Sequence, residues 1–316
     1  MRRIRFYEYG GPEVLRLEEA EAPAPGPGEL LVRTEAIGVT LPSVRAVRGD
    51  GNGGGPPLPG VLGGEVAGEV VGTGPDVTAY TVGDRVTGLP FTGSYAELVT
   101  VPVAPASRIP DGASAVDAVA LVRGGHVALA ALHTAQPVAG TSVLVTGAAS
   151  ATGHLAVQLA KIRGARRVVA AVSGAAGPAK AEFLRGLGAD EVVTYEAESW
   201  GEPAEIALDG VGGELLPRAL AACAPGGRLI FFNSGGGTVP AYELLAGAKT
   251  ITGMTMRRFA ARHPELYVRH GAELWALARE GRLRPAVHAE IPLAEAARAH
   301  AVIEARTNLG KVVLIP

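Results

Sequence analysis

The chain has 316 residues, of which 47% are hydrophobic, and a formal net charge of −2. This length allows two domains with buried cores, and the near-neutral charge argues against a nucleic acid as partner. A single cysteine, Cys223, excludes an internal disulfide and fits a reducing compartment. The N-terminus lacks the apolar stretch of a signal peptide, and no apolar run approaches the length of a membrane span. We therefore expect a soluble, cytoplasmic protein with neither nucleic-acid nor membrane partners.

Residues 1 to about 113 consist of short strand-like runs separated by Gly and Pro. The predicted strands are residues 3–7, 14–17, 29–36, 65–72, 84–88 and 95–101. This pattern indicates an all-β, barrel-like domain. Between Gly49 and Gly60 the composition predicts a long loop, and two interpretations stay open: a lid or binding loop, or a plain solvated connection.

From Ser114, a candidate N-cap, helices alternate with strands. A helix is expected over residues 115–134, and Gly124 and Gly125 are candidates for a break in it. Strands are predicted to begin at Val143, Val168 and Glu191, and further strands to cover residues 206–208, 228–232 and 250–256. This alternation predicts a doubly wound parallel sheet.

After a predicted helix at 265–280 the chain returns to short strands. They cover residues 287–291 and 311–315, with a helix over 293–305 between them. We expect these elements to rejoin the first domain. The overall prediction is an α/β protein with a β-barrel domain, residues 1–118 and 285–316, and an inserted parallel-sheet domain, residues 119–284.

Residues 143–161, VLVTGAASATGHLAVQLAK, predict a strand, a tight turn and a helix. Such a turn directs backbone N–H groups and the positive end of a helix dipole at one point, where a pyrophosphate can bind. Compared with GxGxxG, only Gly153 is in place, although Gly147 precedes the motif. A dinucleotide site and an ordinary crossover without ligand both remain open on these residues. The candidate binding residues are Gly147, Ser150, Ala151, Thr152 and Gly153.

The end of the second strand favours the dinucleotide site. Residues 168–172 end about 20 residues past the turn, where a residue that contacts the ribose belongs. Ser173 and Gly174 stand there, and neither is acidic. An acid would accept from the ribose 2′-OH and repel a 2′-phosphate, so its absence favours NADP over NAD.

The chain resembles the medium-chain dehydrogenase/reductases, in the zinc-free quinone oxidoreductase branch. The resemblance covers the whole chain and rests on eight segments in order: FYEYGGPEVLRL, GEVAGEVVGTGPDVTAYTVGDRV, GSYAELVTVP, the turn motif, LGADEVVTY, LDGVGGELL, APGGRLI and LGKVVLIP. It implies a GroES-like β-barrel domain, an inserted Rossmann domain, a nicotinamide cofactor in the cleft between them, and usually a homodimer.

The resemblance also implies further cofactor contacts. Lys180 matches a lysine at the 2′-phosphate, Arg306 an arginine near the adenosine phosphate, and Tyr195 a tyrosine at the adenine end. Phe232 replaces a glycine ahead of Asn233, which puts a ring near the nicotinamide. The alternative for Lys180 is a solvated helix lysine, and for Arg306 a surface arginine.

A zinc site is not expected. Catalytic zinc needs about three N, S or O protein ligands and a structural zinc lobe needs four cysteines. The chain has one cysteine, and the family's metal-binding histidine position beside Glu65 is Gly64.

The predicted catalytic residues depart from the family pattern. Thr40 stands where the family has an asparagine, Arg45 where it has a tyrosine, and His126 begins a segment that lacks two family hydroxyls. His126 is a candidate proton donor, or else a helix histidine hydrogen-bonded to backbone. Arg45 is a candidate to orient a carboxylate or phenolate, or else a surface arginine.

These residues predict an NADPH-dependent reductase of a conjugated carbonyl, a quinone or an enone, that works without metal. Two alternatives stay open: a tailoring enoyl reductase for a bulky polycyclic substrate, and a protein that binds NADPH without turnover. We also expect a homodimer joined through residues 250–256, an apolar run predicted at the edge of the sheet.

Overall fold

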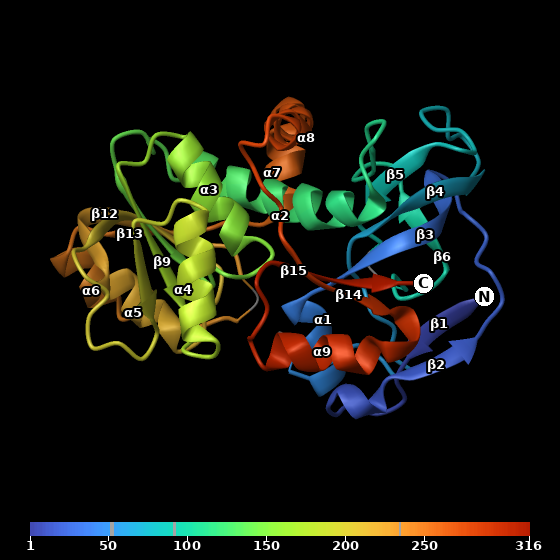
Figure 1. Cartoon of the computed structure of the whole chain (residues 1–316), viewed down its shortest axis with the longest axis horizontal. Coiled ribbons are helices and arrows are strands. Elements are labelled where there is room, and N and C mark those ends of the chain that lie inside the picture. The colour runs from blue at the N-terminus through green and yellow to red at the C-terminus, as the bar shows by residue number, and fades with distance from the viewer. Residues whose placement is uncertain (51–53, 91–92, 234) are drawn as a thin grey trace. The chain divides into compact units, whose positions relative to one another are not determined.

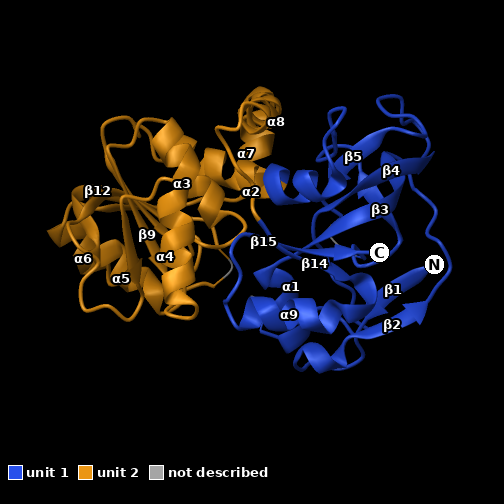
Figure 2. Cartoon of the chain, in the orientation of Figure 1, with its two compact units in different colours: residues 1–122, 287–316 blue, residues 123–286 orange. Residues whose placement is uncertain are grey.

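The computed structural model describes residues 1–50, 54–90, 93–233 and 235–316. They form two compact units, one of Met1–Val122 with Val287–Pro316 and one of Arg123–Ala286 (Figure 2). The second unit is therefore inserted in the sequence of the first, and both termini belong to the first unit (Figure 2).

The first unit is built on a sheet of order β14-β15-β3-β4-β5-β7, with β6 paired to β3. These strands are β3 (Glu29–Val39), β4 (Val66–Thr73), β5 (Arg85–Gly88), β6 (Leu98–Pro102), β7 (Ser107–Arg108), β14 (Val287–Pro292) and β15 (Lys311–Ile315). Strands β1 (Arg2–Arg5) and β2 (Arg16–Glu19) form a separate antiparallel pair. The helical elements are η1 (Pro12–Val14), α1 (Leu41–Arg48), η2 (Leu293–Glu295) and α9 (Ala296–Glu304).

The core of the first unit comes from alternating residues of these strands. In β3, Leu30 and Val32 are fully buried while Arg33 and Glu35 point to solvent, as a half-buried strand requires. Phe6 and Tyr95 are among the largest side chains in this core.

The second unit is a six-stranded parallel sheet of order β10-β9-β8-β11-β12-β13. Its strands are β8 (Ser142–Thr146), β9 (Arg167–Val172), β10 (Glu191–Thr194), β11 (Ala204–Asp209), β12 (Cys223–Phe231) and β13 (Thr250–Gly253). Its helices are α3 (Gly153–Ile162), α4 (Gly177–Gly186), α5 (Leu215–Ala221), α6 (Ala241–Ala246), α7 (Met256–Arg262) and α8 (Pro264–Arg279), labelled in Figure 1. Helix α2 (Ala115–Thr134) contributes residues to both units.

Numbered from β8, the strand order is 3-2-1-4-5-6, the order of dinucleotide-binding Rossmann domains. The predicted α/β architecture with a doubly wound parallel sheet is therefore confirmed. The order reverses between β8 and β11, and ligands of such sheets bind at the carboxyl ends of the strands at this point. Every residue of β8 is buried, which explains the apolar run Val143–Val145 at its centre.

Several local predictions were wrong. Residues 14–17 do not form one strand, because η1 ends at Val14 and β2 begins only at Arg16. The strand predicted over 250–256 ends at Gly253, since Thr255 caps α7 by accepting a hydrogen bond from the Arg258 amide. Of the predicted loop 49–60, residues 51–53 lie outside the described residues.

The predicted break in α2 is also absent, because the helix runs through Gly124 and Gly125. A Cβ at Gly124 would lie 2.8 Å from the Ala151 carbonyl oxygen, and one at Gly125 would lie 2.5 Å from Leu274. The two glycines therefore allow close packing against α2 and do not break the helix. By length and composition alone α2 could cross a membrane, but 78% of its most apolar window is buried inside the protein, as in the core helices of soluble proteins.

Candidate functional site

The turn between β8 and α3 brings two backbone segments unusually close. Gly147 has a φ of +63°, a conformation that favours glycine. A Cβ at Gly153 would lie 2.1 Å from the Gly147 carbonyl oxygen, so only glycine fits there. The Ser150 hydroxyl accepts a hydrogen bond from the Gly153 amide at 3.0 Å and so caps the helix, whereas no side-chain cap comes from Thr152. Ser150 is exposed and Ala151 half-buried beside this helix start.

Tyr195 reaches the same turn from the end of β10. Its hydroxyl accepts a hydrogen bond from the Gly147 amide at 2.8 Å, and its own amide donates to the Val172 carbonyl at 2.8 Å. The Tyr195 ring is tilted relative to the Trp200 ring, and the two ring centroids are 6.1 Å apart. The structure thus brings the predicted residue Tyr195 to the predicted turn.

Lys180 lies at the end of β9. It is only 3% exposed, and its ammonium group donates to the Ser173 hydroxyl at 2.7 Å. It is therefore a buried helix residue rather than a solvated one, and three predicted residues, Ser173, Gly174 and Lys180, come together here. An acid that sequence reasoning missed lies beside them, because the Glu196 carboxylate accepts from the Gly174 amide at 3.1 Å.

The Asp209 side chain links residues at the carboxyl ends of three strands, β8, β11 and β12, through hydrogen bonds. It is fully buried, and its carboxylate accepts from the Thr146 hydroxyl at 2.6 Å, the Gly212 amide at 3.1 Å and the Asn233 side-chain amide at 3.1 Å. Asp209 belongs to the LDGVGGELL segment and was not among the predicted site residues. The available signal was an acid that ends an apolar strand ahead of a glycine-rich turn.

Phe232 lies beside the backbone of Asp209 and Gly210. Its amide donates to the Asp209 carbonyl at 3.2 Å, and a Cβ at Gly210 would lie 3.3 Å from its ring. Phe232 and Asn233 are both half-buried. The ring is thus held at the carboxyl ends of the strands, in the region where a nicotinamide is expected.

His126 is buried in α2 and packs on aromatic rings. It is 4% exposed and stacks on Tyr267 with ring centroids 4.1 Å apart. Burial, assisted by the neighbouring His270, lowers the pKa of His126 to about 4. The imidazole is therefore neutral at pH 7, which differs from the titration near neutrality that sequence reasoning assumed. Its Nδ1 has no hydrogen-bond partner among the described residues.

Thr40, Arg45 and Arg306 belong to the first unit. Thr40 is the N-cap of α1: its Oγ1 accepts from the Ser43 amide at 3.3 Å and lies 2.9 Å from the Ser43 hydroxyl. Because the Ser43 hydroxyl donates to the Gly63 carbonyl at 2.8 Å, the Thr40 hydroxyl is the donor to Ser43. Arg45 is half-buried on α1, and Arg306 is exposed after α9 with a φ of +53°.

The residues beside Glu65 do not fit a zinc ion. The buried Glu65 carboxylate forms an ion pair with the buried Lys311 ammonium, which supplies the positive charge there. Across residues 1–50, 54–90, 93–233 and 235–316, no group of three or more His, Cys, Asp or Glu side chains could hold a metal.

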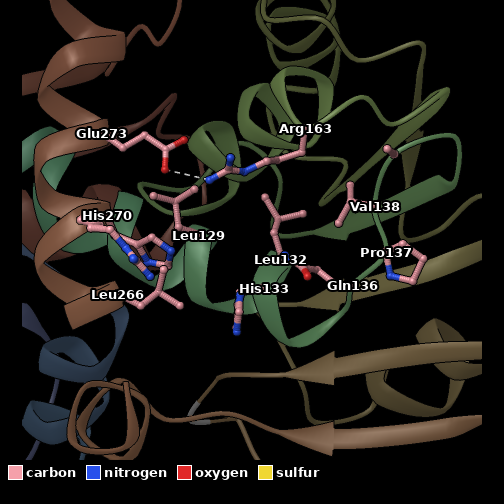
Figure 3. A pocket seen from close by; sticks show the side chains of 12 residues that line it. Leu129, Leu132, His133, Gln136, Pro137, Val138, Arg163, Leu266, His270 and Glu273 are labelled. Atoms are coloured by element: carbon pink, nitrogen blue, oxygen red, sulfur yellow. Dashed lines mark hydrogen bonds and ion pairs between the residues drawn. The ribbon is translucent and has the colours of Figure 1, made fainter. Parts of the chain in front are cut away.

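A cavity of about 520 Å³ lies on the second unit (Figure 3). It is lined by α2, α8 and residues 136–139, with the Arg163 and Glu273 ion pair of 2.8 Å at its wall (Figure 3). None of the predicted cofactor-binding residues lines it. It is therefore not the candidate cofactor site.

Two domain families match parts of the chain. The family described as alcohol dehydrogenase GroES-like domain matches residues 26–111, and the family described as zinc-binding dehydrogenase matches residues 187–314.

Full-length relatives are also similar. A quinone oxidoreductase of Pseudomonas aeruginosa is 34% identical over 332 residues, covering 100% of this chain and 99% of the relative. A 2-haloacrylate reductase of a Burkholderia species is 29% identical, with 98% of both chains covered. Among solved structures, a mycobacterial protein in complex with NADPH superimposes with a TM-score of 0.91 at 34% identity over 100% of both chains.

Proposed function

Since the chain belongs to the medium-chain dehydrogenase/reductase superfamily, in its quinone oxidoreductase branch, we propose that it is an NADPH-dependent reductase of conjugated carbonyls that needs no zinc. The substrate is a small quinone or enone. The observation that carries this proposal is the cluster around the β8 turn, where Gly147, Gly153 and Tyr195 meet, together with Lys180, which is buried and contacts Ser173 at the end of the neighbouring strand β9. We further propose the domain boundaries 1–118 with 285–316 for the GroES-like domain and 119–284 for the Rossmann domain.

The residues at the strand ends fit NADPH. A pyrophosphate would bind at the start of α3, where the first helix N–H groups lack partners within the helix, and Gly147 and Gly153 keep this turn free of side chains. Lys180 would hold the 2′-phosphate. The remaining proposed contacts of the cofactor are Ser150, Ala151, Thr152, Ser173, Gly174, Tyr195, Phe232, Asn233 and Arg306.

When bound, NADPH supplies a hydride to the β-carbon of the acceptor. The chain then has to stabilise negative charge on the acceptor oxygen and deliver a proton. The proposed donors are Thr40, Arg45, His126 and backbone N–H groups. Because His126 is neutral and the Thr40 hydroxyl donates to Ser43, we favour Arg45 for the oxygen and water for the proton. No metal is required, since a conjugated acceptor already spreads the charge.

The 2-haloacrylate reductase similarity supports a role for Arg45. The substrate in that protein's name carries a carboxylate next to a conjugated double bond. A guanidinium can bind a carboxylate through two parallel hydrogen bonds. Arg45 would therefore orient acidic substrates of this chain.

NADPH oxidation tests this proposal. Purified protein is mixed with NADPH and a panel of quinones, small enones, 2-haloacrylates and polycyclic enones, and absorbance of NADPH is followed. We expect turnover of small quinones or enones that survives treatment with a chelator. Turnover of polycyclic enones alone would identify a tailoring reductase, and NADPH binding without any turnover would identify a binding protein; either result contradicts the proposal.

A further inference from the structure

Glu196 follows β10, the third strand of the parallel sheet in chain order. It nevertheless lies at the carboxyl end of β9, the second strand. Strand β10 pairs in parallel with β9, so that Thr194 lies opposite Val172. This register carries Glu196 to Gly174, whose amide donates to the Glu196 Oε2 at 3.1 Å. A Cβ at Gly174 would lie 3.1 Å from the same oxygen, so the glycine permits the close approach.

Two side chains of opposite charge therefore contact the short segment formed by Ser173 and Gly174. The Lys180 ammonium donates to Ser173, and the Glu196 carboxylate accepts from Gly174. In Rossmann domains this segment faces the adenosine ribose. A lysine there attracts a 2′-phosphate, whereas a carboxylate repels it and accepts from a free 2′-OH.

The position of Glu196 is fixed on both sides. The Arg218 guanidinium donates to the Tyr195 carbonyl at 2.5 Å and to the Ala197 carbonyl. It also lies over the Trp200 ring, 4.8 Å from the centroid. Arg218 thus holds the backbone that flanks Glu196, and the Glu196 side chain itself remains exposed to solvent.

We propose that Glu196 sets the selectivity between NADPH and NADH by opposing Lys180 at the ribose. This inference rests on the proposed function. The Glu196 carboxylate already accepts from the Gly174 amide, so this amide does not bind a 2′-phosphate oxygen, and the carboxylate repels the phosphate charge. The chain therefore binds NADPH more weakly than Lys180 alone would allow, and it accepts NADH through the 2′-OH.

The test is a fluorescence titration of wild-type protein and Glu196→Gln with NADPH and with NADH. We expect Glu196→Gln to tighten NADPH binding about tenfold, because a phosphomonoester carries a charge of about −1.5 to −2 and the carboxylate repels it at close range. NADH binding should stay the same or weaken by about threefold. The NADPH gain should shrink at 1 M salt, where exposed charges are screened.

Glu198→Gln is the matched control, since it removes the same charge from an exposed residue two positions away and should leave both affinities unchanged. If the ratio of NADPH affinity to NADH affinity is the same in the wild type and in Glu196→Gln, this inference is overturned and the proposed function stays intact. Failure of the wild type to bind either cofactor would overturn both.

Discussion

Among the residues that the structure describes, four histidine side chains are buried: His126, His154, His270 and His300. Burial lowers the pKa of each to about 4. In His154 the hydrogen bonds explain why the neutral form is required. Its Nδ1 donates to the Ser150 carbonyl at 2.8 Å, and its Nε2 accepts from the Ala286 amide at 3.0 Å. A second proton on Nε2 would break the bond to Ala286.

These lowered pKa values predict acid sensitivity. Because the folded pKa is about 4 and the ordinary value is 6.5, the unfolded chain binds more protons below neutral pH. The stabilisation is complete above pH 6.5 and is lost as pH falls toward 4. For His154 alone we expect a loss of about 1–2 kcal/mol between pH 7 and pH 5. Urea unfolding at these pH values measures it.

A matched pair of variants isolates the histidine contribution. His154→Gln should flatten the dependence of the unfolding free energy on pH, whereas His288→Gln, at an exposed position, should keep the wild-type dependence. An unfolding free energy that is equal at pH 7 and pH 5 in the wild type would contradict the prediction.

At the scale of elements, α2 shows why propensity alone misleads. Glycine is a poor helix former, yet two adjacent glycines lie inside this 20-residue helix. Gly124 faces the Ala151 carbonyl in the turn ahead of α3. Gly124 is therefore explained by this close approach and not by helix propensity. The same contact packs α2 against the turn of the candidate cofactor site.

Gly124→Ala should therefore destabilise the protein. Alanine favours a helix, but its Cβ would lie 2.8 Å from a backbone oxygen, and such overpacking costs about 1–3 kcal/mol. Gly186→Ala at the end of α4 is the control, because nothing lies within 4 Å of its Cβ. Thermal denaturation should show a lower Tm for Gly124→Ala only. An unchanged or higher Tm for that variant would mean that the turn moves freely to accept the methyl group.

At the scale of the whole molecule, the sheet of the second unit has β13 at one edge, as the sequence predicted. Helix α6, which precedes it, has no buried residue, and Tyr242 and Leu245 are 74% and 76% exposed. An edge strand beside exposed apolar side chains is a typical site of assembly. These features support the proposed homodimer, joined through β13.

Light scattering tests the assembly. We expect the mass of a dimer for the wild type at micromolar concentration, and a monomer when Tyr242→Glu and Leu245→Glu are combined, since charge at an apolar interface is costly. Val82→Glu should stay dimeric, because Val82 is a 64% exposed residue of the first unit. Ile251→Pro, which removes a donor from the edge strand, should also give monomer. A monomeric wild type would contradict the assembly, and a dimer that tolerates Ile251→Pro would contradict the interface.

The sequence by itself determined the class of fold and the family. Apolar runs with β-branched residues, separated by Gly and Pro, are local signals, so β8, β9 and most strands of the barrel could be found without coordinates. The turn at residues 147–153 could also be found, because small residues are needed wherever backbone segments approach closely. The predicted end of β13 was wrong because Thr255 caps α7, and the predicted break in α2 was wrong because Gly124 serves a close contact.

Only the tertiary structure decided the chemistry of the site. Glu196 lies 22 residues from Gly174, and Asp209 lies 63 residues from Thr146. Parallel pairing of strands joins residues this far apart, and which of them meet depends on how the strands are ordered in the sheet rather than on their neighbours in sequence. The neutral state of His126 and the burial of Lys180 likewise depend on neighbours distant in sequence, because desolvation is a property of the packed interior rather than of the residue.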